Sequence, residues 1–217
     1  MLGKREGEVF QDREDAARRL AESLKEYRGK HPLVLAIPRG AVPMAKIIAE
    51  ELDGEIDVVL VRKLRSPYSP EFAVGSIDET GWSYIADYAE REGAGKEYLD
   101  REKAIQMQIL ASRRKAYTPP LNPEGRIAIV VDDGLATGST MISALHALRS
   151  RHPSRLICAV PVSPPDTLEK VSRLADETVC LETPEYFQAV GQFYRNFPQV
   201  EDEEVVKILK GVHEKQV

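Results

Sequence analysis

The sequence has few cysteines and no long apolar segment, and each shortage excludes a class of protein. Cys158 and Cys180 are the only cysteines among 217 residues, too few for a disulfide framework or a thiolate metal site. Their apolar surroundings indicate buried free thiols and favour a reducing cytoplasm. No stretch approaches the ~20 apolar residues of a membrane-spanning helix, and the charged start MLGKREGEVFQDRED has no apolar signal core. We therefore expect a cytoplasmic protein with no membrane partner.

An excess of positive charge is also missing. The formal net charge is −5, so the chain carries no general electrostatic footprint for nucleic acid, and we expect no nucleic-acid partner. Apolar residues make up 42% and charged residues 30% of the chain, which is ordinary for a folded domain. A length of 217 residues is typical of one domain with a sizeable core.

Apolar residues recur with two different periods, which predicts the secondary structure. Short continuous apolar runs are typical of strands buried on both faces. Amphipathic spacing predicts helices between them, and the inner face of the longest helix is expected to include Leu99, Ile105, Ile109 and Leu110. The predicted strands cover residues 33–37, 56–61, 126–131, 156–162 and 178–181, with shorter strands at 72–77 and 82–85, and the predicted helices cover residues 12–27, 43–52, 95–117, 139–149, 166–174 and 201–209.

Strands that alternate with helices predict an α/β fold, doubly wound, with a mainly parallel sheet flanked by helices on both faces. In such sheets, ligands bind beyond the carboxyl ends of the strands. Three segments rich in ligand-binding side chains follow predicted strands: Pro38-Arg39-Gly40, Arg62-Lys63 and residues 132–140. We therefore expect the functional site at that edge of the sheet.

The segment VVDDGLATGST, from Val130 to Thr140, combines two acids with a loop of small and hydroxylated residues. The loop Ala136-Thr137-Gly138-Ser139-Thr140 opens a predicted helix, where backbone N–H groups lack partners and the helix dipole attracts anions. This predicts a phosphate site. The loop is neither a Walker motif nor a dinucleotide fingerprint, because Gly-Lys-Ser/Thr and G-x-G-x-x-G are both absent.

Asp132 and Asp133 would repel a simple phosphate at this position. Their presence is explained if the carboxylates accept hydrogen bonds from the diol of a sugar whose 5′-phosphate occupies the loop. Carboxylates can also help to hold Mg²⁺, which prefers oxygen ligands, so both are metal candidates, directly or only through water or the ribose. The alternative is an Asp-Asp turn before an ordinary capped helix.

The string IVVDDGLATGSTM resembles the phosphoribosyl pyrophosphate (PRPP) signature of the type I phosphoribosyltransferases. The resemblance implies that fold, a cytoplasmic role in nucleotide metabolism and a site for PRPP. It places the ribose on Asp132 and Asp133 and the 5′-phosphate on Thr137, Gly138, Ser139 and Thr140, with Ala136 as a further substrate-binding residue. AIPRGAVP resembles the family's pyrophosphate loop, which assigns Pro38, Arg39 and Gly40 to the diphosphate. The family's sheet also sets strands 33–37 and 126–131 side by side.

Arg62 and Lys63 stand where the family begins a mobile loop, so residues 62–73 are expected to form a lid, while Arg65 is interpreted as part of a solvated turn. The implied reaction is a Mg²⁺-dependent displacement of pyrophosphate from PRPP by a nitrogenous base or amine. Asp132, Asp133, Arg39 and Lys63 are the catalytic candidates. No general base is evident, and the four histidines are interpreted as structural or exposed.

The C-terminal segment carries a concentration of aromatic residues, five of the 13 Phe and Tyr residues of the chain: Tyr186, Phe187, Phe193, Tyr194 and Phe197. We expect residues 1–180 to form the core and residues 181–217 to form a hood and closing helix of the same domain. The aromatics either stack on the acceptor or seat the tail. Acceptor identity and oligomeric state stay open, a homodimer included, as does the alternative of a non-catalytic PRPP-sensing regulator of the same fold.

Overall fold

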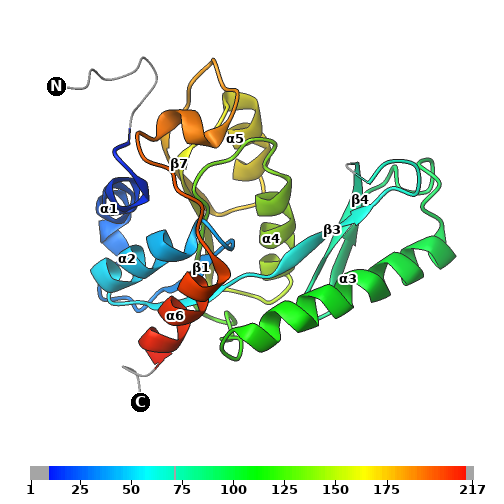
Figure 1. The fold of residues 1–217 in the computed structure, drawn as a ribbon, viewed down its shortest axis with the longest axis horizontal. Coiled ribbons are helices and arrows are strands. Elements are labelled where there is room, and N and C mark those ends of the chain that lie inside the picture. Colours follow the sequence, from blue (N-terminus) through cyan, green and yellow to red (C-terminus); the bar gives the residue numbers. More distant parts are fainter. Residues whose placement is uncertain (1–9, 71, 214–217) are drawn as a thin grey trace.

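The structure is a computed structural model that describes residues 10–70 and 72–213, and its centre is a parallel sheet (Figure 1). The sheet has five strands in the order β2-β1-β6-β7-β8, and all four pairings are parallel. The strands are β1 (Leu33–Ala36), β2 (Glu55–Val58), β6 (Ile127–Val131), β7 (Arg155–Val162) and β8 (Glu177–Glu182). This confirms the predicted α/β fold with a mainly parallel sheet.

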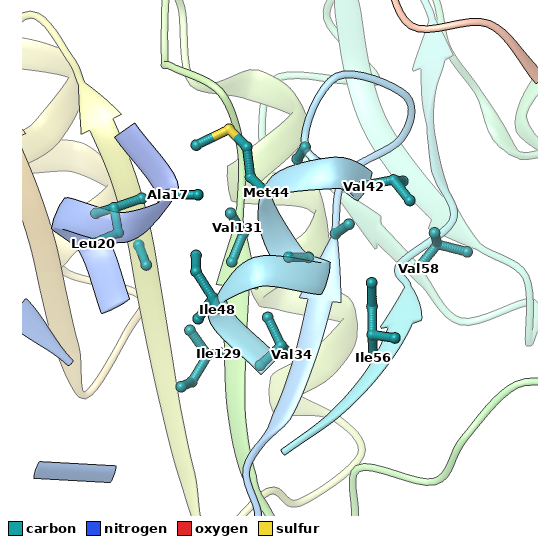
Figure 2. Close-up of a cluster of buried hydrophobic side chains, with 14 of the residues drawn as sticks. Ala17, Leu20, Val34, Val42, Met44, Ile48, Ile56, Val58, Ile129 and Val131 are labelled. Carbon is teal, nitrogen blue, oxygen red and sulfur yellow. The ribbon is translucent and has the colours of Figure 1, made fainter. Parts of the chain in front are cut away.

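Helices cover both faces of this sheet because successive strand residues point to opposite sides. One face packs against α1 (Arg13–Ser23), α2 (Val42–Leu52) and the C-terminal α6 (Asp202–His213). The other face packs against α4 (Ser139–Arg149) and α5 (Pro165–Ser172). Figure 2 shows the first layer, in which Leu20 of α1 and Ile48 of α2 lie over Val34 and Ile129 of the sheet. These contacts hold the carboxyl ends of β1 and β6 in a fixed relation.

A second, antiparallel sheet projects from the side of the core (Figure 1). It has three strands in the order β3-β4-β5, namely β3 (Val61–Arg65), β4 (Ala73–Asp78) and β5 (Ser83–Ile85). The long helix α3 (Lys96–Ala116) contacts β3 and β4, and α4 contacts all three strands of this sheet. The predicted strand 56–61 is therefore two strands, because β2 ends at Val58 and β3 pairs with β4 instead. The first part of the expected lid, residues 62–65, is a strand.

The prediction for the inner face of α3 was half wrong. Ile105 and Ile109 are 48% and 37% exposed, whereas Leu110 is buried together with the polar Glu102 and Gln106. Those two polar side chains are buried because they accept hydrogen bonds from arginines of β3, which an apolar pattern cannot reveal.

The C-terminal segment returns over the sheet before α6. It includes the short 3₁₀ helix η2 (Val190–Phe193), and a second one, η1 (Lys25–Tyr27), follows α1. Cys158 is buried as predicted, but Cys180 on the edge strand β8 is only half-buried. The division into residues 1–180 and 181–217 stays a prediction. None of the helices that the structure describes combines the length and apolarity needed to cross a membrane.

Candidate functional site

The loop between β6 and α4 has the backbone of an anion site. Gly138 precedes α4 with a φ of +72°, and a Cβ there would lie 2.7 Å from Thr167 Cγ2, so only glycine fits without strain. The hydroxyls of Thr137 and Ser139 lie 3.0 Å apart, and Ser139 begins the helix. The N–H groups of this first turn have no intrahelical acceptors. That of Ser139 makes only a long contact of 3.5 Å with Thr137 Oγ1, so the turn can bind an anion.

A cavity of about 210 Å³ opens at this loop and joins it to residues from three other parts of the chain. Lys63 comes from β3, Asp132 from the end of β6 and Val190 from η2. Its full lining is Lys63, Asp132, Gly134, Leu135, Ala136, Thr137, Gly138, Ser139, Thr140, Met141 and Val190. Larger cavities of about 500 and 600 Å³ lie along α3 and among α1, α2 and α6. The first-turn helix residues in their linings are Asp202 in one and Glu14, Pro43 and Glu204 in the other, and none of these carries a hydroxyl group.

Asp132 is the carboxylate that lines this cavity. Its Oδ1 accepts a hydrogen bond of 2.9 Å from the backbone N–H of Asp133, and the described residues donate no bond to its other oxygen. Burial raises the pKa of Asp132 well above its ordinary value, and the charge of Asp133 raises it further, while the hydrogen bond from the Asp133 N–H and the charge of Arg13 oppose the rise. A ligand that donates hydrogen bonds to this carboxylate would favour its charged form.

Asp133 is held by a residue that sequence analysis missed. Its Oδ2 accepts hydrogen bonds from Arg13 Nε at 3.0 Å and Arg13 Nη2 at 2.8 Å, and Tyr194 donates its hydroxyl to the Asp133 backbone carbonyl at 2.7 Å. Arg13 belongs to the first turn of α1. No local signal distinguishes Arg13 from Arg18 and Arg19.

The loop after β1 lies beside the loop after β6, because these strands pair in parallel with Ala36 opposite Val131. Contact is close at Gly40, where a Cβ would lie 2.1 Å from Asp133 Oδ2. The Arg39 side chain, however, points toward the start of α6. Its Nη1 lies 3.7 Å from Glu201 Oε2 and 3.6 Å from Asp202 Oδ2. Pro38, Arg39 and Gly40 are therefore near the acids but outside the cavity lining.

The two adjacent basic residues of β3 have different surroundings. Lys63 lines the cavity, whereas Arg62 donates a hydrogen bond to Gln106 of α3. Burial lowers the pKa of Arg62, as do Arg113 and Arg65. Arg65, interpreted as part of a solvated turn, instead pairs with the buried Glu102 at 3.0 Å. The alternation of a strand separates Arg62 from Lys63.

The aromatic residues of the tail mainly pack against one another. Tyr194 lies against Phe10 and Phe197 with ring centroids 5.4 and 4.6 Å away. Phe187 and Phe193 form a similar pair at 5.2 Å, and Tyr186 is 88% exposed. This arrangement favours the interpretation that they seat the tail, which reaches the cavity through Val190.

No histidine lines the cavity among the residues that the structure describes. His146 stacks on Tyr84 at 4.3 Å with the planes 4° apart, and His31 Nδ1 lies 2.9 Å from the Asp53 carbonyl oxygen. The side chain of His213 is outside the described residues. Residues 10–70 and 72–213 also contain no cluster of three or more His, Cys, Asp or Glu arranged to hold a metal ion.

Comparison with known proteins identifies the family. The family described as "Phosphoribosyl transferase domain" matches residues 7–197. Two Mycobacterium tuberculosis strains each contain a protein named "Putative phosphoribosyl transferase" that is 41% identical over 209 residues. These matches cover 94% of this chain and 47% of each relative, so the chain spans about half the length of those relatives.

A crystal structure, that of TT1426 from Thermus thermophilus, is 41% identical with a TM-score of 0.84, over 94% of this chain and 98% of that one. The likeness therefore includes the projecting sheet and α3 as well as the parallel core. Because the family also matches residues 7–197, the chain belongs to the phosphoribosyl transferase domain family.

Proposed function

We propose that the chain is a Mg²⁺-dependent phosphoribosyltransferase that transfers phosphoribosyl from PRPP to a nitrogenous base or amine and releases pyrophosphate. The observation that carries the proposal is the cavity in which a hydroxyl-rich helix N-terminus, the Asp132 carboxylate and the Lys63 ammonium meet. These three groups match the phosphate, the diol and the diphosphate of one ligand.

The binding roles follow from charge and hydrogen-bonding capacity. Thr137, Gly138, Ser139 and Thr140 would hold the 5′-phosphate through hydroxyls and through N–H groups that lack intrahelical acceptors. Asp132 and Asp133 would accept hydrogen bonds from the ribose hydroxyls, each worth about 1.5–3 kcal/mol when a charged group takes part. The acids would thus distinguish a phosphosugar from free phosphate, which they repel.

The chemical step would use the basic residues. Negative charge grows on the leaving diphosphate as its bond to the anomeric carbon breaks, and Lys63 would stabilise that charge. The Pro38–Gly40 loop would contribute backbone groups, and Arg39 would join them after leaving its 3.6–3.7 Å contacts with Asp202 and Glu201. The acids would offset positive charge on the ribose.

Mg²⁺ fits this donor set as an ion that arrives with the diphosphate. The protein supplies two adjacent carboxylates, and Arg13 already binds one oxygen of Asp133, so the ligand must contribute most of the coordinating oxygens, as is usual for Mg²⁺. When bound, the ion would neutralise charge on the leaving diphosphate.

The test is to incubate the protein with PRPP, Mg²⁺ and a panel of bases and amines and to measure pyrophosphate release. We expect release with at least one acceptor and a large loss of rate in Lys63→Met. Lys170→Met, which removes an exposed lysine of α5, is the matched control and should be neutral. Tight PRPP binding without release for every acceptor would contradict catalysis and favour the sensing regulator.

A further inference from the structure

The contact between Arg13 and Asp133 crosses 120 positions of sequence and joins three parts of the fold. The Arg13 guanidinium places Nε and Nη2 on the same carboxylate oxygen, Oδ2, at 3.0 and 2.8 Å. Its Nη1 donates to the Pro198 carbonyl oxygen at 2.6 Å. One side chain of α1 therefore ties the β6–α4 loop to the C-terminal segment.

This ion pair is enclosed between two neighbours. The Phe197 ring stacks on the guanidinium, with Arg13 Cζ 3.8 Å from the ring centroid. Gly40 closes the other approach, since a Cβ there would lie 2.1 Å from Asp133 Oδ2 and 3.1 Å from Arg13 Nη2. The side chains of Arg13 and Asp133 are only 12% and 17% exposed. Such packing fixes the carboxylate far more strictly than a surface pair would.

The ion pair gives the two carboxylate oxygens of Asp133 different surroundings. Oδ2 is bound to Arg13, while Oδ1 accepts no hydrogen bond from the residues that the structure describes. The preceding residue, Asp132, and the following residue, Gly134, line the cavity at the β6–α4 loop, whose lining does not include Asp133 itself. Arg13 also offsets the charge that two adjacent carboxylates bring to a site meant for an anionic ligand.

We propose that Arg13 is a positioning residue that orients Asp133 so that its free oxygen receives a ribose hydroxyl, and that Arg13 thereby makes the site selective for phosphosugars with an intact ring diol. This inference rests on the proposed function, because it takes Asp133 as part of the ribose site. Arg13 itself acts only through Asp133 and touches no reacting atom.

The experiment compares calorimetric affinities for ribose 5-phosphate and 2,3-dideoxyribose 5-phosphate, which lacks both diol hydroxyls. We expect Arg13→Met to weaken ribose 5-phosphate binding about tenfold, the scale of one charge-assisted hydrogen bond, and to leave the dideoxy ligand unchanged. Arg13→Lys keeps the positive charge but not the paired N–H donors of the guanidinium, so it should lose less affinity for ribose 5-phosphate. Arg18→Met is the matched control on α1, where Arg18 forms an exposed pair with Glu14, and should bind both ligands as the wild type does.

A double-mutant cycle tests whether Arg13 works through the acid. Arg13→Met combined with Asp133→Asn should bind ribose 5-phosphate no more weakly than Asp133→Asn alone. Additive losses would overturn the inference, as would equal weakening of both ligands by Arg13→Met, which indicates a general structural role. If Arg13→Met does not fold, Phe197→Leu removes only the stacking ring and should still lower the preference for the diol; an unchanged preference would overturn the inference.

The same data separate the positioning role from the proposed function. If Asp133→Asn weakens ribose 5-phosphate binding but Arg13→Met does not, the positioning role fails and the ribose site stands. If the wild type binds both ligands equally and Asp133→Asn changes nothing, the proposed function itself fails.

Discussion

Arg114 should be among the most sensitive positions of the chain, because it fastens the projecting sheet to the core. Its guanidinium binds both carboxylate oxygens of Glu79 at 2.6 Å and Asp57 Oδ1 at 3.0 Å. It also donates to the carbonyl oxygens of Thr118 and Val58 at 3.0 and 3.1 Å. The Asp57 side chain is 2% exposed, and those of Arg114 and Glu79 are each 13% exposed. Removing the arginine would take away the countercharge of both acids, although Asp57 would keep hydrogen bonds from the backbone N–H groups of Val58 and Leu121 at 2.7 and 2.8 Å.

Arg114→Met keeps the aliphatic stem and deletes the charge. Removing one partner of a buried ion cluster costs about 3–5 kcal/mol, because the remaining charges stay buried without a countercharge. For a domain of this size, each kcal/mol lowers the melting temperature by about 2–4 °C, so a fall of about 6–20 °C is expected. Urea denaturation monitored by two probes gives the free energy and checks that unfolding is two-state.

Arg173→Met provides the control, since the side chains of Arg173 and Glu169 are 72% and 68% exposed and such pairs contribute about 0–1 kcal/mol. If Arg114→Met lowered the free energy of unfolding no more than Arg173→Met, the contacts of Arg114 would not hold the two sheets together. Arg114→Met should also lower PRPP affinity, because the projecting sheet carries Lys63 to the cavity.

Three further predictions concern the site and its surroundings. Thr137→Val should weaken calorimetric PRPP binding about tenfold, roughly one charge-assisted hydrogen bond, and unchanged affinity here and in Asp133→Asn would refute the site assignment. Gly138→Ala should cost about 1–3 kcal/mol, because a left-handed φ and Thr167 both oppose a side chain; an unchanged urea midpoint would contradict this. Burial lowers the pKa of His146, so the stability that its neutral form contributes is lost as pH falls from about 6.5 through the lowered pKa. His146→Phe should therefore flatten the decline of melting temperature between pH 7 and 5, and parallel curves for the two proteins would count against it.

The parallel sheet and the loop that leads into α4 could be predicted because their signals are local. Continuous apolar runs such as residues 127–131 require burial on both faces, and a hydroxyl-rich loop before an amphipathic segment requires a helix N-terminus beside the strand end. The segment from Val130 to Thr140 contains both signals in sequence, so the strand, the loop and the helix α4 follow directly from the residues.

The remaining features depend on contacts between distant segments. Arg13 meets Asp133 only after α1 packs on the sheet, and nothing near Arg13 in the sequence marks it. Arg62 and Lys63 look alike in a basic cluster, and only the pairing of β3 with β4 decides that Lys63 alone reaches the cavity. The wrong prediction for Ile105 has the same cause. Arginines of β3 bind the polar residues Glu102 and Gln106, so these residues take the inner face of α3.

The most direct test of the account is a crystal structure with ribose 5-phosphate bound. We predict that the phosphate lies on the N–H groups and hydroxyls of residues 137–140, with the ring hydroxyls on Asp132 and Asp133. A sugar phosphate bound elsewhere, for example along α3 near Arg113, with the Asp132 carboxylate unoccupied, would contradict the account.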